Sequence, residues 1–345
     1  MMILYEEKKF QLDDFVYKYI PSWKNLKYYQ SGKYPNFKSK IPDNHMTIKD
    51  LLSHQSGLTY GFSQKTEVDK AYREKGIGRM ESLHTNQTLE DMINLLSEVP
   101  LEFSPGSSWN YSVSTDVLGY LIELISGKSF DTFLKERIFK PLNMNDSGFY
   151  VPESKLNRFA ANYIFNEGKE SGESISLINQ DTKESGPPIL IEDPMISPYS
   201  KNPTFFSGGG GLVSTIDDYL NFCIMLLNKG SYKNHQILSE KTINLMTNNH
   251  ITDKKDLLET ASGRWSETTY AGIGFGLGFQ ILLDPVKSQI ISSKGEYGWG
   301  GAASTVFWID PKEDLITIFL TQLLPSSAYN IRRELRTLVY SSINN

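Results

Sequence analysis

Cysteine is almost absent from this chain, and its scarcity limits the available chemistry. Cys223 is the one cysteine in 345 residues, so no disulfide can form within the chain, and its apolar helical surroundings predict a buried structural thiol. The five histidines lack close spacing to one another or to Cys223, so we expect no zinc site. No apolar run reaches the length of a membrane span.

Long runs of one charge are also missing. The net charge of -5 is spread along the chain without the basic stretch typical of nucleic-acid binding, so we expect no nucleic-acid partner. With 39% hydrophobic side chains, the composition is that of an ordinary globular protein. Its core can support one two-lobed unit or two domains.

Several catalytic motifs are absent as well. Gly-x-Ser-x-Gly occurs nowhere, and no serine has a lysine three residues later. The nearest match, Thr132 with Lys135, lies in an amphipathic helical pattern and is interpreted as structural. Residues 208–211 are four glycines without the Gly-Lys-Ser/Thr ending of a phosphate loop, and residues 298–303 match a dinucleotide fingerprint but precede a strand. We interpret His54 as a hydrogen-bonded structural histidine.

Helix starts are marked by threonine caps. Three threonines stand three residues before an aspartate and ahead of apolar helical patterns: Thr47, Thr88 and Thr215. Further helices are predicted after Ser114, as a cap, up to Gly127, and over residues 130–139. Residues 1–7 resemble the apolar end of a helix without a cap, and residues 168–202 predict a long surface loop.

The pattern changes after Phe205 to short runs of β-branched and aromatic residues. Strands are predicted at 275–283, 303–309 and 315–321, the last two joined as a hairpin. A final amphipathic helix is predicted to lie on this sheet through apolar residues at helical spacing: Ile331, Leu335, Leu338 and Val339.

These elements predict an α/β (α+β) fold in which an antiparallel sheet is flanked by helices and joined to a helical lobe. We expect residues 1–345 to form a single domain. Its mainly helical lobe would span about 20–204, and its α/β lobe would combine 205–345 with 1–19.

Two short segments carry the candidate site. Tyr111 follows a turn-rich segment and stands just before a helix, where a phenol can lie at the edge of a cleft. The run Trp299, Gly300, Gly301 and Ala302 is predicted to open a strand, and glycines there let a substrate approach backbone N–H groups. Each segment alone also has a structural interpretation, as packing for the tyrosine and as a β-bulge for the glycines.

In combination, the order of six segments resembles the β-lactamase-related serine hydrolases, which include class C β-lactamases, DD-peptidases and family VIII carboxylesterases. The resemblance spans nearly the whole chain. The segments are Lys-Phe-Gln-Leu-Asp-Asp at 9–14, Thr-Ile-Lys-Asp-Leu-Leu-Ser-His-Gln-Ser-Gly-Leu at 47–58, Tyr-Ser-Val-Ser-Thr-Asp-Val-Leu-Gly at 111–119, Phe-Lys-Pro-Leu-Asn-Met at 139–144, Gly-Gly-Gly-Leu-Val-Ser-Thr at 209–215 and Trp-Gly-Gly-Ala at 299–302.

The resemblance implies acyl transfer through a covalent seryl intermediate, with a lysine three residues after the serine. It makes Tyr111 the tyrosine that relays a proton. Trp299, Gly300 and Gly301 would bind substrate, and the Ala302 N–H would be one oxyanion donor. Val113 is implied as a further substrate-binding position. It replaces the asparagine of β-lactam-active members, and Trp-Gly-Gly replaces their Lys-Thr-Gly, so both changes favour esters over β-lactams.

The Ser-x-x-Lys nucleophile motif is missing from these residues. Because the family's nucleophilic helix runs directly into a segment like residues 2–14, we expect an N-terminally truncated member whose missing sheet elements leave an exposed edge and favour self-association. The full-length protein is then expected to be a carboxylesterase acting on small esters. The alternatives are an inactive binding or vestigial homologue, and a β-lactamase or DD-peptidase. No cofactor or metal is implied, and the compartment is left open.

Overall fold

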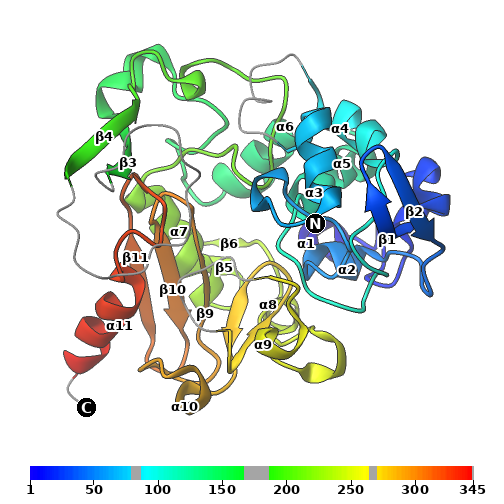
Figure 1. Ribbon diagram of the computed structural model, residues 1–345. Coiled ribbons are helices and arrows are strands. Elements are labelled where there is room, and N and C mark those ends of the chain that lie inside the picture. Colours follow the sequence, from blue (N-terminus) through cyan, green and yellow to red (C-terminus); the bar gives the residue numbers. More distant parts are fainter. Residues whose placement is uncertain (79–86, 167–185, 264–269, 344–345) are drawn as a thin grey trace.

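The computed structural model describes residues 1–78, 87–166, 186–263 and 270–343, and it places a helical part beside an antiparallel sheet (Figure 1). The α-helices are α1 (Met2–Glu6), α2 (Ile48–Leu52), α3 (Glu67–Lys75), α4 (Leu89–Leu96), α5 (Ser114–Ser126), α6 (Phe130–Leu134), α7 (Ile216–Leu227), α8 (Glu240–Met246), α9 (Leu257–Thr260), α10 (Pro285–Ser288) and α11 (Ile331–Ser341). The strands are β1 (Tyr28–Lys33), β2 (Asn36–Lys40), β3 (Asn162–Asn166), β4 (Gly186–Glu192), β5 (Ser231–Tyr232), β6 (His235–Gln236), β7 (Ile273–Phe275), β8 (Gln280–Leu282), β9 (Tyr297–Gly300), β10 (Val306–Asp310), β11 (Leu315–Phe319) and β12 (Leu323–Leu324). No helix in these parts of the chain is both long and apolar enough to cross a membrane.

The main sheet has five antiparallel strands in the order β11-β10-β9-β8-β7. Neighbouring residues of a strand face opposite sides, and β10 shows this clearly. Phe307 packs edge-on against Tyr219 of α7, with ring centroids 5.1 Å apart, whereas Trp308 lies under the guanidinium of Arg336 from α11 at 4.4 Å. Helices therefore cover both faces, and the predicted α/β class with an antiparallel sheet is confirmed.

The predicted threonine caps are confirmed. Thr47 and Thr88 each accept a hydrogen bond from the N–H three residues on, and the aspartate there bonds back to complete a capping box. Thr215 caps α7 in the same way through its hydroxyl. The cap predicted at Ser114 is wrong: Val113 is the N-cap of α5, and Ser114 is its first residue, bonded instead to other buried hydroxyls.

Three of the strand and loop predictions need correction. Residues 275–283 form a hairpin of β7 and β8 rather than one strand, because Gly276 and Phe279 close a turn between them. Strand β10 begins at Val306 rather than at 303. Residues 186–192 of the predicted loop form β4, which pairs with β3, and residues 167–185 lie outside the described residues.

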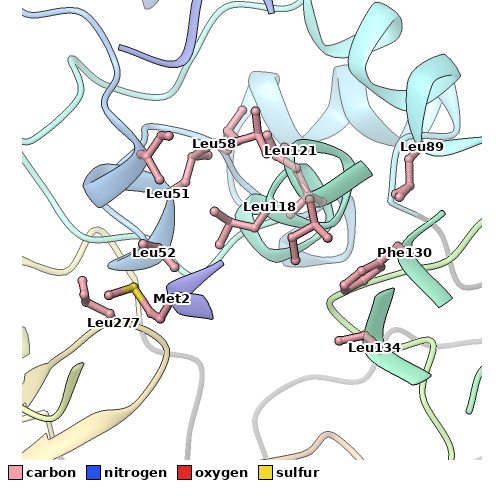
Figure 2. Packing of buried hydrophobic residues seen from close by; sticks show 14 of the residues in the cluster. Met2, Leu51, Leu52, Leu58, Leu89, Leu118, Leu121, Phe130, Leu134 and Leu277 are labelled. Atoms are coloured by element: carbon pink, nitrogen blue, oxygen red, sulfur yellow. The ribbon is translucent and has the colours of Figure 1, made fainter. Parts of the chain in front are cut away.

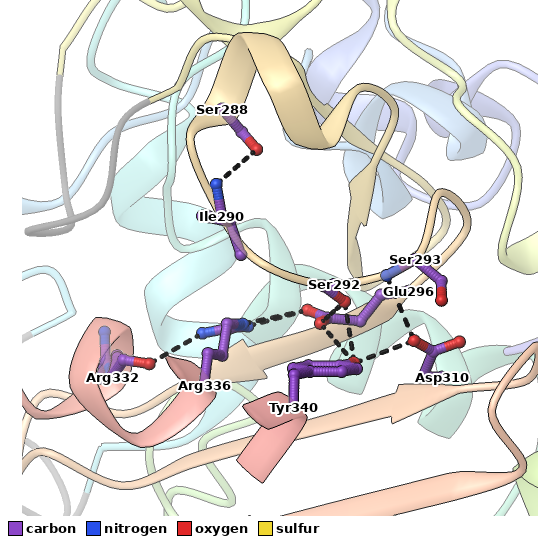
Figure 3. Close-up of polar contacts among 9 residues, drawn as sticks. All are labelled: Ser288, Ile290, Ser292, Ser293, Glu296, Asp310, Arg332, Arg336 and Tyr340. Carbon is purple, nitrogen blue, oxygen red and sulfur yellow. Dashed lines mark hydrogen bonds and ion pairs between the residues drawn. The ribbon is translucent and has the colours of Figure 1, made fainter. Parts of the chain in front are cut away.

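The face of α11 that meets the sheet is only partly the predicted one: Ile331, Leu335 and Val339 are half-buried, but the helix also buries two arginines. Leu338 is 68% exposed, whereas Arg336 is 2% exposed and bonds to the buried Glu296 at 2.9 Å. In Figure 3, Tyr340 of the same helix bonds to Asp310 of β10 at 2.9 Å. The helix docks through charged and polar side chains because the sheet offers buried carboxylates to pair with them.

One hydrophobic cluster joins the helical part to the sheet. Figure 2 shows Met2 of α1 between Leu52 and Leu277, so this short helix lies where the two parts meet. Across the predicted boundary near residue 204, β12 pairs with β3, which connects the two parts again. The division into two lobes at that residue stays a prediction.

Candidate active site

Tyr111 and Trp299 come from distant segments and meet in the structure. Tyr111 lies just before α5 and Trp299 lies in β9, yet their ring centroids are 5.2 Å apart with planes tilted by 48°. Both side chains are half-buried. The two segments singled out in the sequence thus form one surface between the helical part and the sheet.

Further aromatic rings surround this pair. Tyr60 and His54 pack against Tyr111 with centroids at 5.1 and 4.9 Å, and Phe275 packs edge-on against Trp299 at 5.3 Å. Exposed Phe62 stacks on Tyr60 at 4.6 Å. The aromatic set gives Tyr111 a largely apolar environment with few rotamers available.

The environment of Tyr111 keeps its phenol protonated at neutral pH. Burial raises the pKa of Tyr111, and hydrogen bonds with Trp299 and Tyr60 offset only part of that rise. Since the indole N–H can only donate, Trp299 donates to the Tyr111 oxygen. The phenol can therefore donate a hydrogen bond or proton while its own oxygen is held in place.

A buried carboxylate, Asp116 of α5, anchors the glycine-rich loop beside these rings. It accepts hydrogen bonds from the Ser207 hydroxyl at 2.6 Å and the Gly209 N–H at 3.1 Å. The Gly210 N–H donates to Ser207 at 3.1 Å, so these loop amides are engaged within the protein and the rejected phosphate-loop interpretation gains no support. A Cβ at Gly209 would lie 2.5 Å from the Tyr60 hydroxyl, which explains the glycine there.

His54 belongs to a chain of buried hydroxyls behind Tyr111. Its Nδ1 lies 3.2 Å from the Ser112 hydroxyl, which lies 2.8 Å from Ser114, which in turn lies 2.8 Å from Ser56. The ring is 3% exposed, and burial lowers the pKa of His54 to about 3, so it stays neutral. The structural interpretation of His54 is confirmed.

The glycines after Trp299 lie in a turn. Trp299 and Gly300 end β9 instead of opening a strand, which corrects the sequence expectation. Gly301 donates its N–H to the Thr305 carbonyl at 2.9 Å, closing the turn. Ala302 lies exposed on that turn, and its N–H has no hydrogen-bond partner among the described residues. An unengaged N–H three residues after Trp299 is available to a substrate oxygen.

Val113 is placed differently from the other predicted site residues. Its side chain is fully buried in the core, and a Cβ added at Gly78 would lie 2.7 Å from it. The structure gives Val113 a packing role as the N-cap residue of α5, and its substrate-binding role stays a prediction.

The sequence interpretation missed Tyr60 and Asp116. Tyr60 lies two residues beyond the segment 47–58, and Asp116 lies within 111–119 without an assigned role. A charged residue at an otherwise apolar helix position was the available signal for Asp116, because a buried carboxylate requires hydrogen-bond donors nearby.

The remaining candidates are structural. Burial raises the pKa of Cys223 to about 12, so the thiol stays protonated, which confirms its interpretation as a buried structural residue. Within the described ranges, no group of three or more His, Cys, Asp or Glu side chains is arranged to hold a metal ion.

Comparisons with known proteins identify the family. A family model described as Beta-lactamase matches residues 1–341. Protein Rv1367c of Mycobacterium tuberculosis is 31% identical over 327 residues, which cover 94% of this chain and 74% of that protein. Esterase EstB of Burkholderia gladioli is 26% identical over 290 residues, covering 83% of this chain and 68% of the esterase.

Among solved structures, the fold resembles EstCE1, a hydrolase with promiscuous acyltransferase activity. The TM-score is 0.75 at 25% identity, and the match covers 98% of this chain and 80% of EstCE1. The chain belongs to the Beta-lactamase family of serine hydrolases, as the resemblance of its motifs implied.

Proposed function

We propose that this protein takes part in carboxylic ester hydrolysis, with Tyr111 as the proton relay and the Ala302 N–H as an oxyanion donor. The observation that carries the proposal is the ring contact between Tyr111 and Trp299 beside a turn that presents an unengaged N–H. The names of the similar proteins EstB and EstCE1 support an acyl-ester substrate.

The proposed reaction follows from these positions. A seryl hydroxyl attacks the ester carbonyl and forms an acyl-enzyme, while its proton passes through Tyr111 to the departing alkoxide, which leaves as the alcohol. Water then attacks the acyl-enzyme and releases the carboxylic acid with the serine regenerated. The Ala302 N–H would stabilise the negative oxygen in both steps. A protonated Tyr111 suits the donation step.

The test is a p-nitrophenyl butyrate assay of the 345-residue chain and, if the reading frame of its gene extends further, of the longer product as well. We expect turnover in the protein that holds a Ser-x-x-Lys motif and its near loss in Tyr111→Phe, because phenylalanine keeps the ring contacts but cannot carry a proton. A fully active Tyr111→Phe variant would refute this role.

A non-catalytic binding role is the second candidate, because no serine among the 345 residues has a lysine three positions later. It predicts that short-chain esters bind without turnover, which calorimetry would detect. If the reading frame encodes no Ser-x-x-Lys motif, this second function replaces the first. If the first function holds, we expect β-lactam hydrolysis to be slower than ester hydrolysis, because Val113 and Trp-Gly-Gly stand at the Asn and Lys-Thr-Gly positions of β-lactam-active members.

Self-association is proposed through β11, the edge strand of the five-stranded sheet. Its five residues are half-buried, with four of them apolar, and its outer edge, which pairs with no other strand among the described residues, offers backbone N–H and C=O groups to a second copy. Light scattering after gel filtration should show oligomers that increase with concentration, and a sharp monomer peak at all concentrations would contradict the proposal.

A further inference from the structure

We infer that Arg332 is a positioning residue for the oxyanion donor: it orients and polarises the peptide unit that carries the Ala302 N–H. The inference rests on the proposed function, since it concerns the same turn. It assigns a role to a residue of α11 that lies far along the chain from Tyr111 and outside every motif found in the sequence.

The contacts place one guanidinium across the turn. Arg332 is 8% exposed, and its Nη2 donates to the Gly301 carbonyl at 2.6 Å and to the Thr305 carbonyl at 3.0 Å. Thr305 also accepts from the Gly301 N–H at 2.9 Å. A single nitrogen of Arg332 therefore joins the first and last residues of the turn.

The Gly301 carbonyl belongs to the same peptide unit as the Ala302 N–H. That peptide is trans, so the carbonyl and the N–H point in opposite directions. By holding the carbonyl toward α11, Arg332 directs the N–H away from the helix. A cationic donor on the carbonyl also draws electron density from the amide, which strengthens the N–H as a hydrogen-bond donor.

Gly300 makes room for this guanidinium. A Cβ at Gly300 would lie 2.4 Å from the Arg332 Cζ, so any larger residue would displace the arginine. On the other side of the turn, the Ser304 hydroxyl donates to the Leu323 carbonyl at 2.6 Å. The turn is thus held from two sides. Only the Arg332 contact places a positive charge beside the peptide unit that carries the Ala302 N–H.

The activity test uses Arg332→Met and Arg332→Lys, with Arg336→Met and Arg333→Met of the same helix as matched controls. All four are made in a protein that holds the Ser-x-x-Lys motif. Removing an entire oxyanion donor lowers kcat by about 10²–10³, so loss of its positioning residue should lower kcat by roughly 10- to 100-fold with KM little changed. Arg332→Lys should recover only part of the loss, because an ammonium restores a charged donor but not the fixed directions of the two Nη2 hydrogens. Arg336→Met, also buried, and exposed Arg333→Met should keep kcat at a temperature where both are folded.

A second variant tests the same contact from the glycine side. Gly300→Ala should lower kcat by a similar factor, because its methyl group displaces the guanidinium. In the Arg332→Met background the same change should add little, and this non-additivity would distinguish displacement of Arg332 from general damage to β9. Fully additive losses would overturn the inference.

An NMR measurement on the 345-residue chain separates this inference from the proposed function. The Ala302 amide proton should shift upfield in Arg332→Met and stay in place in Arg336→Met, whether or not any ester is hydrolysed. An unchanged Ala302 resonance in Arg332→Met would overturn the role of Arg332. A shifted resonance in Arg332→Met, together with no turnover by a protein that holds the Ser-x-x-Lys motif, would instead uphold the role of Arg332 and refute the esterase proposal.

Discussion

The two sides of the candidate site are held in different ways. On the helical side, Tyr111 is surrounded by aromatic rings and is followed in sequence by the bonded hydroxyls of Ser112 and Ser114, with Asp116 as the buried charge. On the sheet side, Arg332 of α11 holds the turn after Trp299, whereas Arg336 of the same helix pairs with Glu296 at the opposite end of β9. The helical side is therefore organised by aromatic packing and hydroxyl hydrogen bonds, and the sheet side by charges brought from the end of the chain.

The largest loss of stability is expected from removing the most deeply buried charge on the sheet side. Arg336→Met would leave Glu296, 3% exposed, without its guanidinium, and breaking such a buried pair costs about 3–5 kcal/mol of unfolding free energy. Urea denaturation would measure the loss. The double variant with Glu296→Gln should recover part of it, and exposed Arg333→Met should change stability by less than ~0.5 kcal/mol. Equal losses for Arg333 and Arg336 would contradict the assignment.

The contrast explains which parts of the fold could be predicted from the sequence. The caps at Thr47 and Thr88 and the hairpin of β10 and β11 depend on short sequence patterns, so they were predicted correctly. The two buried arginines of α11 were not predicted to face the sheet, because arginines spaced four apart look like the polar face of an exposed helix. Only the folded chain brings Glu296 and the Gly301 carbonyl to them.

The same reasoning applies to the candidate site. The segments of Tyr111 and Trp299 were found through the order of motifs, and the structure brings their rings together. The anchoring role of Asp116 was missed because its partners, Ser207 and Gly209, lie far along the chain in a glycine-rich loop without a recognisable function of its own. Residues that carry chemistry have sequence signatures, whereas the residues that hold them depend on the fold.

Acid sensitivity should come from the helical side. The pKa of His54 is about 3 in the folded protein and near 6.5 when unfolded, so the unfolded state binds a proton first as the pH falls. Above pH 6.5 this group costs nothing, and between pH 6.5 and 3 it should lower stability by up to ~1.4 kcal/mol per pH unit. His54→Gln, which can still bond to Ser112, should flatten the dependence of unfolding free energy on pH. An unchanged acid slope would show that other groups dominate.

Loss of the Asp116 anchor should have a smaller effect. Asp116→Ala leaves the Ser207 hydroxyl without its acceptor and leaves the Gly209 N–H only its longer bond to Ser207 at 3.3 Å, at a cost of about 1–3 kcal/mol. Asp116→Asn keeps an acceptor oxygen and should cost less. Because its hydrogen-bond network shares no residue with that of Arg336, the two losses should add within ~0.5 kcal/mol in the double variant. A large coupling energy would show that the two sides of the site are not held independently.

The smallest expected effect is the difference in stability between two capping boxes of the helical part, one exposed and one buried. Thr88 and Asp91 form an exposed capping box, so Thr88→Ala should cost about 0.5–1 kcal/mol, the usual value of an N-cap. Thr47 forms the same box with Asp50, whose carboxylate is 6% exposed and accepts from the Thr47 hydroxyl at 2.7 Å. Thr47→Ala removes a donor from a buried carboxylate and should approach ~2 kcal/mol. Thermal unfolding of both variants would measure the difference between their losses of unfolding free energy. Equal losses would mean that burial of Asp50 adds nothing to the stabilising effect of the cap, so that local geometry alone accounts for it.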